Sequence, residues 1–224
     1  MDTLILVEST AGGSDKKLIE KLIESDPLLN DFSYKIITQD QKNSENKKYV
    51  GSIDEVLKYL KIGLPKEREI TLREINNLLI IVDADENAGD RFKEIIKALK
   101  TNNSVFSIPD KLGSIKKDEG KISTGVFLFP NNKDCGSLES LVWNCSENCE
   151  SKKECVENYL ACLRDKKIDD KMTANNKAKA KIRIMAATPK PDNYVEHLIE
   201  LIDFNSESLK ELSNFLKEAN LNNR

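Results

Sequence analysis

The sequence predicts an α/β fold in which a parallel sheet of about four strands is flanked by helices, with additional helices in the C-terminal part. Short apolar runs alternate with amphipathic segments along the first half of the chain. The longest run is unbroken, as expected for a strand buried on both faces. The later segments show helical patterns only. We therefore predict one domain, with an α/β core over residues 1–130 and a mainly helical extension over residues 131–224.

The four expected strands are short apolar runs that end at turn-forming or helix-capping residues. Residues 3–7 (TLILV) precede the turn-rich stretch STAGGSD, and residues 32–38 (FSYKIIT) form a second candidate. Residues 77–85 (NLLIIVDAD) give the strongest prediction, because Leu, Ile and Val follow one another without a break. Residues 124–130 (TGVFLFP) end at a proline, which cannot continue a central strand.

Helices are predicted where apolar residues recur at a spacing of three or four. In the core these segments are residues 15–25, 53–62 and 88–100, and residues 63–74 are expected to form a loop. Right-handed crossovers between parallel strands would follow from this alternation. In the extension, helical patterns cover residues 137–145, 152–165, 173–188, 193–202 and 206–219.

Composition and charge exclude several classes of protein. The 35 basic and 38 acidic side chains give a formal charge of −3, so no overall field attracts the protein to nucleic acid or a membrane. The N-terminal sequence MDTLILVEST lacks the basic flank and length of a signal peptide, and no segment has the length of a membrane span. Five cysteines, an odd number, argue against a secreted disulfide framework. We expect a cytoplasmic protein without membrane contact.

Three carboxylates follow two of the predicted strands. Glu8 comes after the first, and Asp83 and Asp85 end the strongest. Ligands bind beyond the carboxyl ends of strands in open parallel sheets, so these acids can converge there on Mg²⁺, which prefers oxygen ligands. The alternative is turn and capping chemistry, because the helix that starts near Asn87 needs a cap that Asp85 or Glu86 could supply.

The order of these motifs resembles a known domain. A glutamate after the first strand, a loop and helix, and VDAD after a later strand are similar to the Toprim domain of topoisomerases, bacterial primases and overcoming-lysogenization-defect (OLD) nucleases. The segments TGVFLFPNNKDCGSLESLV, CVENYLACL and NKAKAKIRIMAAT resemble a family of small stand-alone Toprim-like proteins of largely uncharacterised activity. The resemblance covers residues 3–219.

The resemblance implies a four-stranded parallel Toprim sheet and a set of functional residues. Glu8, Asp83 and Asp85 would hold Mg²⁺ or Mn²⁺, and Glu8 would also serve as an acid or base. Glu139 resembles a further glutamate that OLD-type nucleases use near their metals. Lys177 is a candidate for a lysine that steadies phosphate charge.

Two functions are compatible with this pattern. The first is magnesium-dependent phosphoryl transfer, above all cleavage of nucleic-acid phosphodiesters by a nuclease. The second is a non-catalytic Toprim-like interaction or sensor protein with a vestigial metal site, partnered by an ATPase or a defence system. Toprim chains usually carry glycine directly after the glutamate, whereas here Ser9 follows and a longer loop leads to Asp15, which favours the second function. The pattern predicts no oligomeric state.

A local basic face is the only region suited to nucleic acid. Between residues 171 and 189 the chain carries five basic side chains and no acid. On a helix Lys177 and Lys181 share one face, where they could bind the phosphates of a strand. The alternative is a solvated basic surface. The basic residues of this segment are Lys171, Lys177, Lys179, Lys181 and Arg183.

Four cysteines lie within 18 residues but do not have the spacing of a metal site. No Cys-x-x-Cys pair is present, and the only histidine, His197, is distant in the sequence. We interpret Cys155 and Cys162, seven residues apart, as small buried groups of a helix. Trp143 is expected to fill the core, and one histidine cannot build a Ser-His-Asp triad.

Overall fold

The computed structural model describes residues 2–9, 13–38, 53–63, 75–102, 104–146, 149–168, 172–187 and 194–222. Its centre is a five-stranded sheet of order β2-β1-β3-β5-β4. The first four strands in this order are parallel, and β4 runs antiparallel to β5. The α/β prediction and its parallel sheet are confirmed. The strands are β1 (Thr3–Val7), β2 (Tyr34–Ile37), β3 (Asn77–Asp83), β4 (Ile115–Lys116) and β5 (Ser123–Phe129).

The central strands are buried on both faces, which explains their continuous apolar sequences. All five residues of β1 and all seven of β5 are buried, as are the first six of β3. In the register of β1 and β3, Val7 lies beside Ile81, so β3 extends two residues further to Asp83. The residue after β1 and the last residue of β3 therefore reach the same edge of the sheet.

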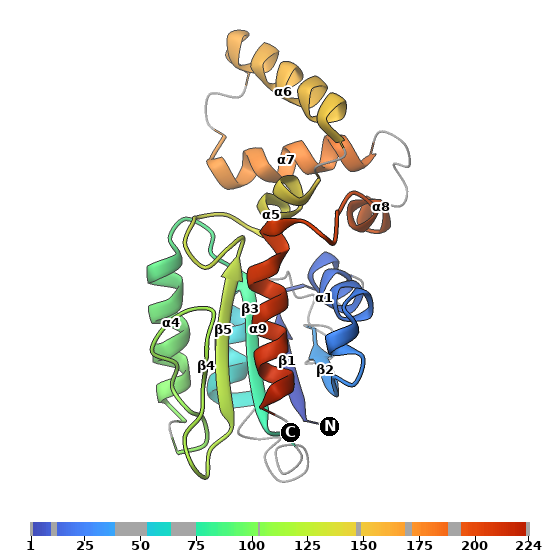
Figure 1. Cartoon of the computed structure of the whole chain (residues 1–224). Helices are drawn as coiled ribbons and strands as arrows, with labels where there is room; N and C mark the ends of the chain where they lie inside the picture. The colour runs from blue at the N-terminus through green and yellow to red at the C-terminus, as the bar shows by residue number, and fades with distance from the viewer. Residues whose placement is uncertain are drawn as a thin grey trace, which may run out of the picture.

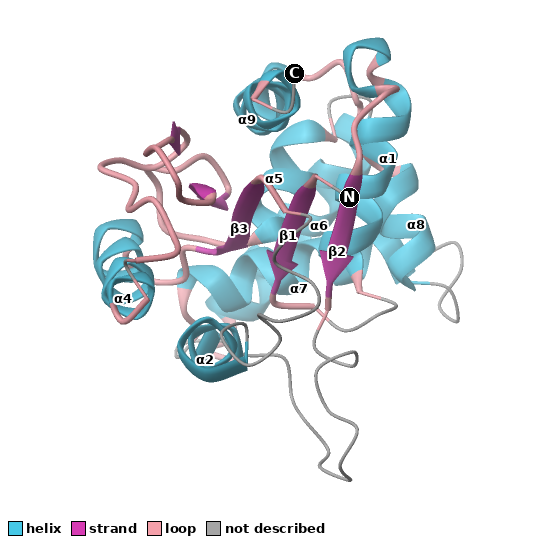
Figure 2. Ribbon diagram, turned by 90° about the horizontal axis from the view of Figure 1, so that it is seen from below, coloured by secondary structure: helices cyan, strands magenta, loops and turns pink. Residues whose placement is uncertain are grey.

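Helices cover both faces of the sheet (Figure 2). One face packs against α1 (Ser14–Ser25) and α9 (Lys210–Leu221). The other packs against α2 (Ile53–Lys58), the π-helical turn Tyr59–Gly63 and α4 (Ala88–Lys100). Alternate strand residues point to the two layers, which gives two separate apolar cores.

Four further helices lie beyond the carboxyl ends of the parallel strands (Figure 1). Among them α7 contacts the other three, so it forms the centre of this layer. Short 3₁₀ turns at Pro27–Leu29 and Glu207–Leu209 precede β2 and α9. The four helices are α5 (Leu138–Cys145), α6 (Glu150–Asp165), α7 (Ala174–Ala187) and α8 (Tyr194–Glu200).

The C-terminal segment is not a separate helical addition, because α9 returns to the sheet. The ring of Phe215 lies against β5, and Asn77 Nδ2 at the start of β3 donates a hydrogen bond of 3.1 Å to the carbonyl oxygen of Ala219. The sequence pattern predicted later helices packed around or beside the sheet, but not which of them returns to it. It also missed β4, while residues 64–74 of the expected loop lie outside the described residues. None of the described helices is long and apolar enough to cross a bilayer.

Candidate functional site

Asp83 joins the end of the sheet to the helical layer above it. It is the last residue of β3, and its Oδ1 accepts a hydrogen bond of 2.9 Å from the backbone N–H of Leu138, the first residue of α5. A carboxylate at this position interacts favourably with the positive end of the helix dipole. The sequence places Asp83 there because the apolar run of β3 ends one residue before it.

Asp85 is held by its backbone and by two side chains. Its φ angle of +52° belongs to the left-handed region, and its backbone N–H and C=O pair with Gly136 at 2.8 and 2.7 Å. Its carboxylate forms an ion pair with Arg91 of α4 and accepts a hydrogen bond of 3.0 Å from Asn175 Nδ2 of α7. Asp85 does not cap α4, since Asn87 accepts the hydrogen bond from Asp90 N.

Glu8 points into a crowded acidic environment. Burial raises the pKa of its carboxyl group to about 7, with further increases from the negative charges of Asp85 and then Asp15. Arg91 and Lys179 partly oppose these effects. Within the described residues, the buried Oε1 of Glu8 has no hydrogen-bond partner. The side chain is therefore available to a proton or to another cation.

Asp15, in the first turn of α1, belongs to the same group of acids. Burial raises its pKa to about 6, and the charge of Glu139 contributes to this rise. The pKa of Asp83 lies well above its usual range because of burial and then the charges of Asp15, Glu8 and Glu139. We call these five carboxylates the acid cluster: Glu8, Asp15, Asp83, Asp85 and Glu139.

Two lysines of α7 have different surroundings. Lys179 lies beside the acid cluster, with its Nζ 3.9 Å from Asp83 Oδ2. Lys177 instead lines a cavity between α5, α6 and α7. Glu139, at the start of α5, accepts a hydrogen bond of 2.7 Å from Ser137 Oγ. The structure thus places Glu8, Asp83, Asp85 and Glu139 near one another. Lys177 faces the cavity, so it lies on a different side of α7 from Lys179.

The chemistry of the acid cluster fits a hard divalent cation in part. All its donors are oxygen atoms, and Glu8 Oε1 is buried with no partner among the described residues. However, in the described ranges no three His, Cys, Asp or Glu side chains surround one metal-sized gap. The fit is therefore for an ion held by one or two carboxylates and completed by water and substrate phosphate, as is common for Mg²⁺.

Comparison with known proteins gives the family. The model of the DUF3226 family, described as a protein of unknown function, matches residues 2–220. The chain belongs to the DUF3226 family. No curated protein and no solved structure gives a significant match. The DUF3226 assignment agrees with the expected stand-alone family of uncharacterised activity and assigns no reaction.

Sequence reasoning missed four residues of the candidate site. Asp15 could have been found as the first acid after the loop that follows Glu8. The sequence alone could not show which lysine of α7 faces the acids, since successive residues of a helix point about 100° apart. No sequence pattern indicated Arg91 or Asn175 as site residues, because both residue types are common on helix surfaces.

The cysteine prediction for this DUF3226 protein was wrong in one respect. Cys155 and Cys162 are exposed on α6, whereas Cys145 is buried and Cys149 is partly buried. These two side chains therefore face solvent and do not pack in a core. Trp143 is only partly buried at the margin of the core, and it lines the same cavity as Lys177.

Proposed function

We propose that this DUF3226 protein is a divalent-cation-dependent phosphoryl-transfer enzyme that cleaves nucleic-acid phosphodiesters. The observation that carries the proposal is the acid cluster at the carboxyl edge of the parallel sheet, where burial and then neighbouring negative charges raise the pKa of Glu8, Asp15 and Asp83. A bound cation would relieve this repulsion, so the cluster gains more from a cation than isolated surface acids would. The position is also the one where open α/β sheets bind ligands.

The residues have distinct expected roles. One or two of Asp83, Asp85 and Glu8 would be the metal ligands, with water and substrate phosphate completing the coordination, and a bound Mg²⁺ or Mn²⁺ would polarise a phosphoryl oxygen and acidify a water. When Glu8 is not bound to the cation, its pKa of about 7 lets it accept or donate a proton at neutral pH. Arg91 and Lys179 supply fixed positive charge next to these acids, where a phosphate group would need it.

The resemblance to Toprim domains supports nucleic acid as the substrate class. The order of Glu8, the Asp-x-Asp pair and Glu139 resembles that of Toprim-containing nucleases, and the first three acids follow strands β1 and β3 at one edge of the sheet. The basic side chains of α7 provide a local surface for the phosphates of a strand, although the overall charge is −3.

A cleavage assay tests the proposal. Single- and double-stranded DNA and RNA are incubated with the protein and either Mg²⁺, Mn²⁺ or a chelator. We expect cleavage that requires a cation and falls at least 100-fold in Asp83→Asn and in Glu8→Gln. The matched control is Asp110→Asn, which removes an exposed carboxylate paired with Lys116 and should retain full activity. Cation-independent cleavage, or equal activity in all variants, would overturn the proposed mechanism.

A non-catalytic interaction or sensor protein with a vestigial metal site is the second candidate. It is favoured by Asp85, whose carboxylate is already bound by Arg91 and Asn175. Intramolecular cations can replace a lost metal in this way. In that case Asp83→Asn would change neither cation binding nor cleavage, and the acid cluster would act through a protein partner such as an ATPase or a defence component.

A further inference from the structure

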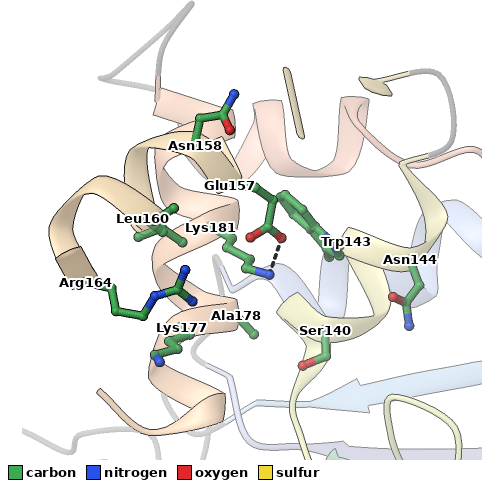
Figure 3. Close-up of a pocket in the computed structure, with 11 residues that line it drawn as sticks. Ser140, Trp143, Asn144, Glu157, Asn158, Leu160, Arg164, Lys177, Ala178 and Lys181 are labelled. Atoms are coloured by element: carbon green, nitrogen blue, oxygen red, sulfur yellow. Dashed lines mark hydrogen bonds and ion pairs between the residues drawn. The ribbon is translucent and has the colours of Figure 1, made fainter. Parts of the chain in front are cut away.

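A cavity of about 600 Å³ lies between α5, α6 and α7, outside the acid cluster (Figure 3). Its volume falls in the range of small-molecule sites, roughly 300 to 1,000 Å³. We propose that this cavity binds a nucleoside phosphate, either as a free nucleotide or as one unit of a single strand. The inference goes beyond the proposed function, because the cavity can bind this ligand whether or not the acid cluster binds a cation.

The charge of the cavity favours an anion. Arg164 of α6 and Lys177 and Lys181 of α7 line it, together with one carboxylate, Glu157. Glu157 forms an ion pair with Lys181, which neutralises the one negative side chain among the described residues of the lining (Figure 3). Arg164 and Lys177 have no carboxylate partner among the described residues. Two uncompensated cations therefore face the space, and arginine binds phosphate in a planar, two-pronged geometry.

The opposite part of the cavity is suited to a planar ring. Trp143 of α5 is partly buried there, and two ammonium groups lie over its ring, Lys181 Nζ at 4.9 Å and Lys153 Nζ at 5.6 Å from the centroid, so a base would stack on the ring in place of one of these lysines. The cation–π contact of Lys181 and its ion pair to Glu157 place it between the aromatic and the basic parts. Leu160 adds an apolar surface, with only 8% of its area exposed. An aromatic wall next to free cations matches a base joined to a phosphate.

Polar groups that could read the edge of a base complete the lining. Asn144 and Asn158 each carry an amide that can both donate and accept hydrogen bonds, as the edges of bases require. An acidic peptide would satisfy the cations but would leave these amides and the indole ring without a matching group. Inorganic phosphate would leave most of the volume unfilled. A nucleoside phosphate has a matching group for each part of the cavity: a phosphate for the cations, a ring for Trp143 and a base edge for the amides.

The cavity is next to the candidate active site. Ser140 of α5 borders both this cavity and a second cleft, which is lined by Asp85 and Arg91. The helix α7 contributes to both, with Asn175 at the cleft and Lys177 in the cavity. A nucleotide in the cavity could thus be continuous with a strand that passes the acid cluster.

The fluorescence of Trp143 tests the proposal directly, because it is the only tryptophan of the chain. The protein is titrated in a chelator with adenosine monophosphate, with single-stranded DNA and RNA octamers, and with three comparison ligands: adenosine, pyrophosphate and polyglutamate. We expect a saturable change in the emission of Trp143 with at least one of the nucleotide probes. Its affinity should be at least tenfold higher than that of each comparison ligand. Tighter binding of the octamers identifies a strand as the ligand, and tighter binding of the mononucleotide identifies a free nucleotide.

Paired charge variants provide the control. Arg164→Gln with Lys177→Gln should weaken nucleotide binding at least tenfold. Lys152→Gln with Lys100→Gln removes the same charge from exposed positions of α6 and α4 outside the lining of the cavity and should change binding less than twofold. Because the titrations are carried out in a chelator, the result is separate from any failure of the acid cluster to bind a cation.

Three results would overturn the proposal. They are the absence of a saturable change with every nucleotide probe, equal affinity for pyrophosphate or polyglutamate, and unchanged binding in the Arg164→Gln, Lys177→Gln double variant. Calorimetry on the same samples gives an independent measure of binding, so a ligand that binds without altering the tryptophan emission is also detected.

Discussion

At the scale of single residues, Asp83 shows a conflict between stability and the proposed function. It is largely buried, with 16% of its side chain exposed, and its pKa lies well above the usual range because of burial and the neighbouring acids. The hydrogen bond from Leu138 N and the nearby Lys179 offset this only in part. A charged Asp83 therefore destabilises the folded state unless a cation neutralises it.

Replacement of Asp83 by asparagine should increase stability at pH 8. The asparagine oxygen can still accept the hydrogen bond from Leu138 N, while the buried charge is lost. We expect the free energy of unfolding in a chelator to rise, measured by chemical denaturation, because the raised pKa of Asp83 shows that its charged form is disfavoured in the folded state. Asp110→Asn, at an exposed ion pair, should change it by no more than about 0.5 kcal/mol. A less stable Asp83→Asn protein would contradict this view of the acid cluster.

The site residues were partly predictable because the strand-end rule needs only the sequence. Glu8, Asp83 and Asp85 follow apolar runs, and parallel strands bring such positions to one edge. The partners of these acids depend on tertiary packing instead. Arg91 reaches Asp85 from α4, and Asn175 reaches it from α7, 90 residues away along the chain. No local pattern encodes the contact from Asn175, whereas Arg91 is only six residues from Asp85 along the chain.

At the scale of elements, the return of α9 to the sheet depends on Gly125. A Cβ atom at this position of β5 would lie 2.7 Å from Cε2 of Phe215 and 3.0 Å from Ile115 Cγ1. The glycine therefore permits the close approach of the Phe215 ring to the strand. On the same helix, Glu218 accepts a hydrogen bond of 3.2 Å from the backbone N–H of Ile115 in β4.

Gly125→Ala should destabilise the protein through this contact. We expect a loss of about 1 to 3 kcal/mol in the free energy of unfolding, because the ring cannot move without disturbing its neighbours. In a Phe215→Leu background the same substitution should cost less than half as much, since the smaller side chain leaves room for the methyl group. Denaturation of the four proteins in a double-mutant cycle measures this coupling. Equal costs in the two backgrounds would show that Phe215 is not the obstacle.

Elements with long, regular patterns were predictable, and those that depend on distant contacts were not. The apolar runs of β1, β3 and β5 and the amphipathic pattern of α4 gave bounds within one or two residues of the structure. Strand β4 has only two residues, which is too few to show an alternation of apolar and polar side chains. It forms a strand only because it pairs with β5. The apolar face of α9 indicated a helix but not the surface that it covers.

At the scale of the whole molecule, the acid cluster makes stability depend on pH and cations. The pKa of Glu8 is raised from 4.5 to about 7 and that of Asp15 from 3.8 to about 6, so the folded state binds protons more tightly than the unfolded chain. The stabilisation from these protons is complete below about pH 4 and is lost as the pH rises through 6 to 7.

In a chelator, the free energy of unfolding should therefore fall by an amount on the order of 2 to 4 kcal/mol between pH 5 and pH 8. Millimolar Mg²⁺ or Mn²⁺ at pH 8 should restore much of this loss, because a ligand that binds only the folded state stabilises it. Glu8→Gln should flatten the pH profile. Denaturation curves across this pH range measure the effect, and stability that rises toward pH 8 without cations would be inconsistent with the raised pKa values.

Calorimetric titration of Mg²⁺ and Mn²⁺ into the protein at pH 8 tests the central claim most directly. We predict saturable binding to the wild type and to Asp110→Asn, at least tenfold weaker binding to Asp83→Asn and Glu8→Gln, and weaker binding to the wild type at pH 6, where protons compete for the same oxygens. No saturable binding to the wild type, or equal affinity in all four proteins, would contradict the assignment of the acid cluster as a cation site.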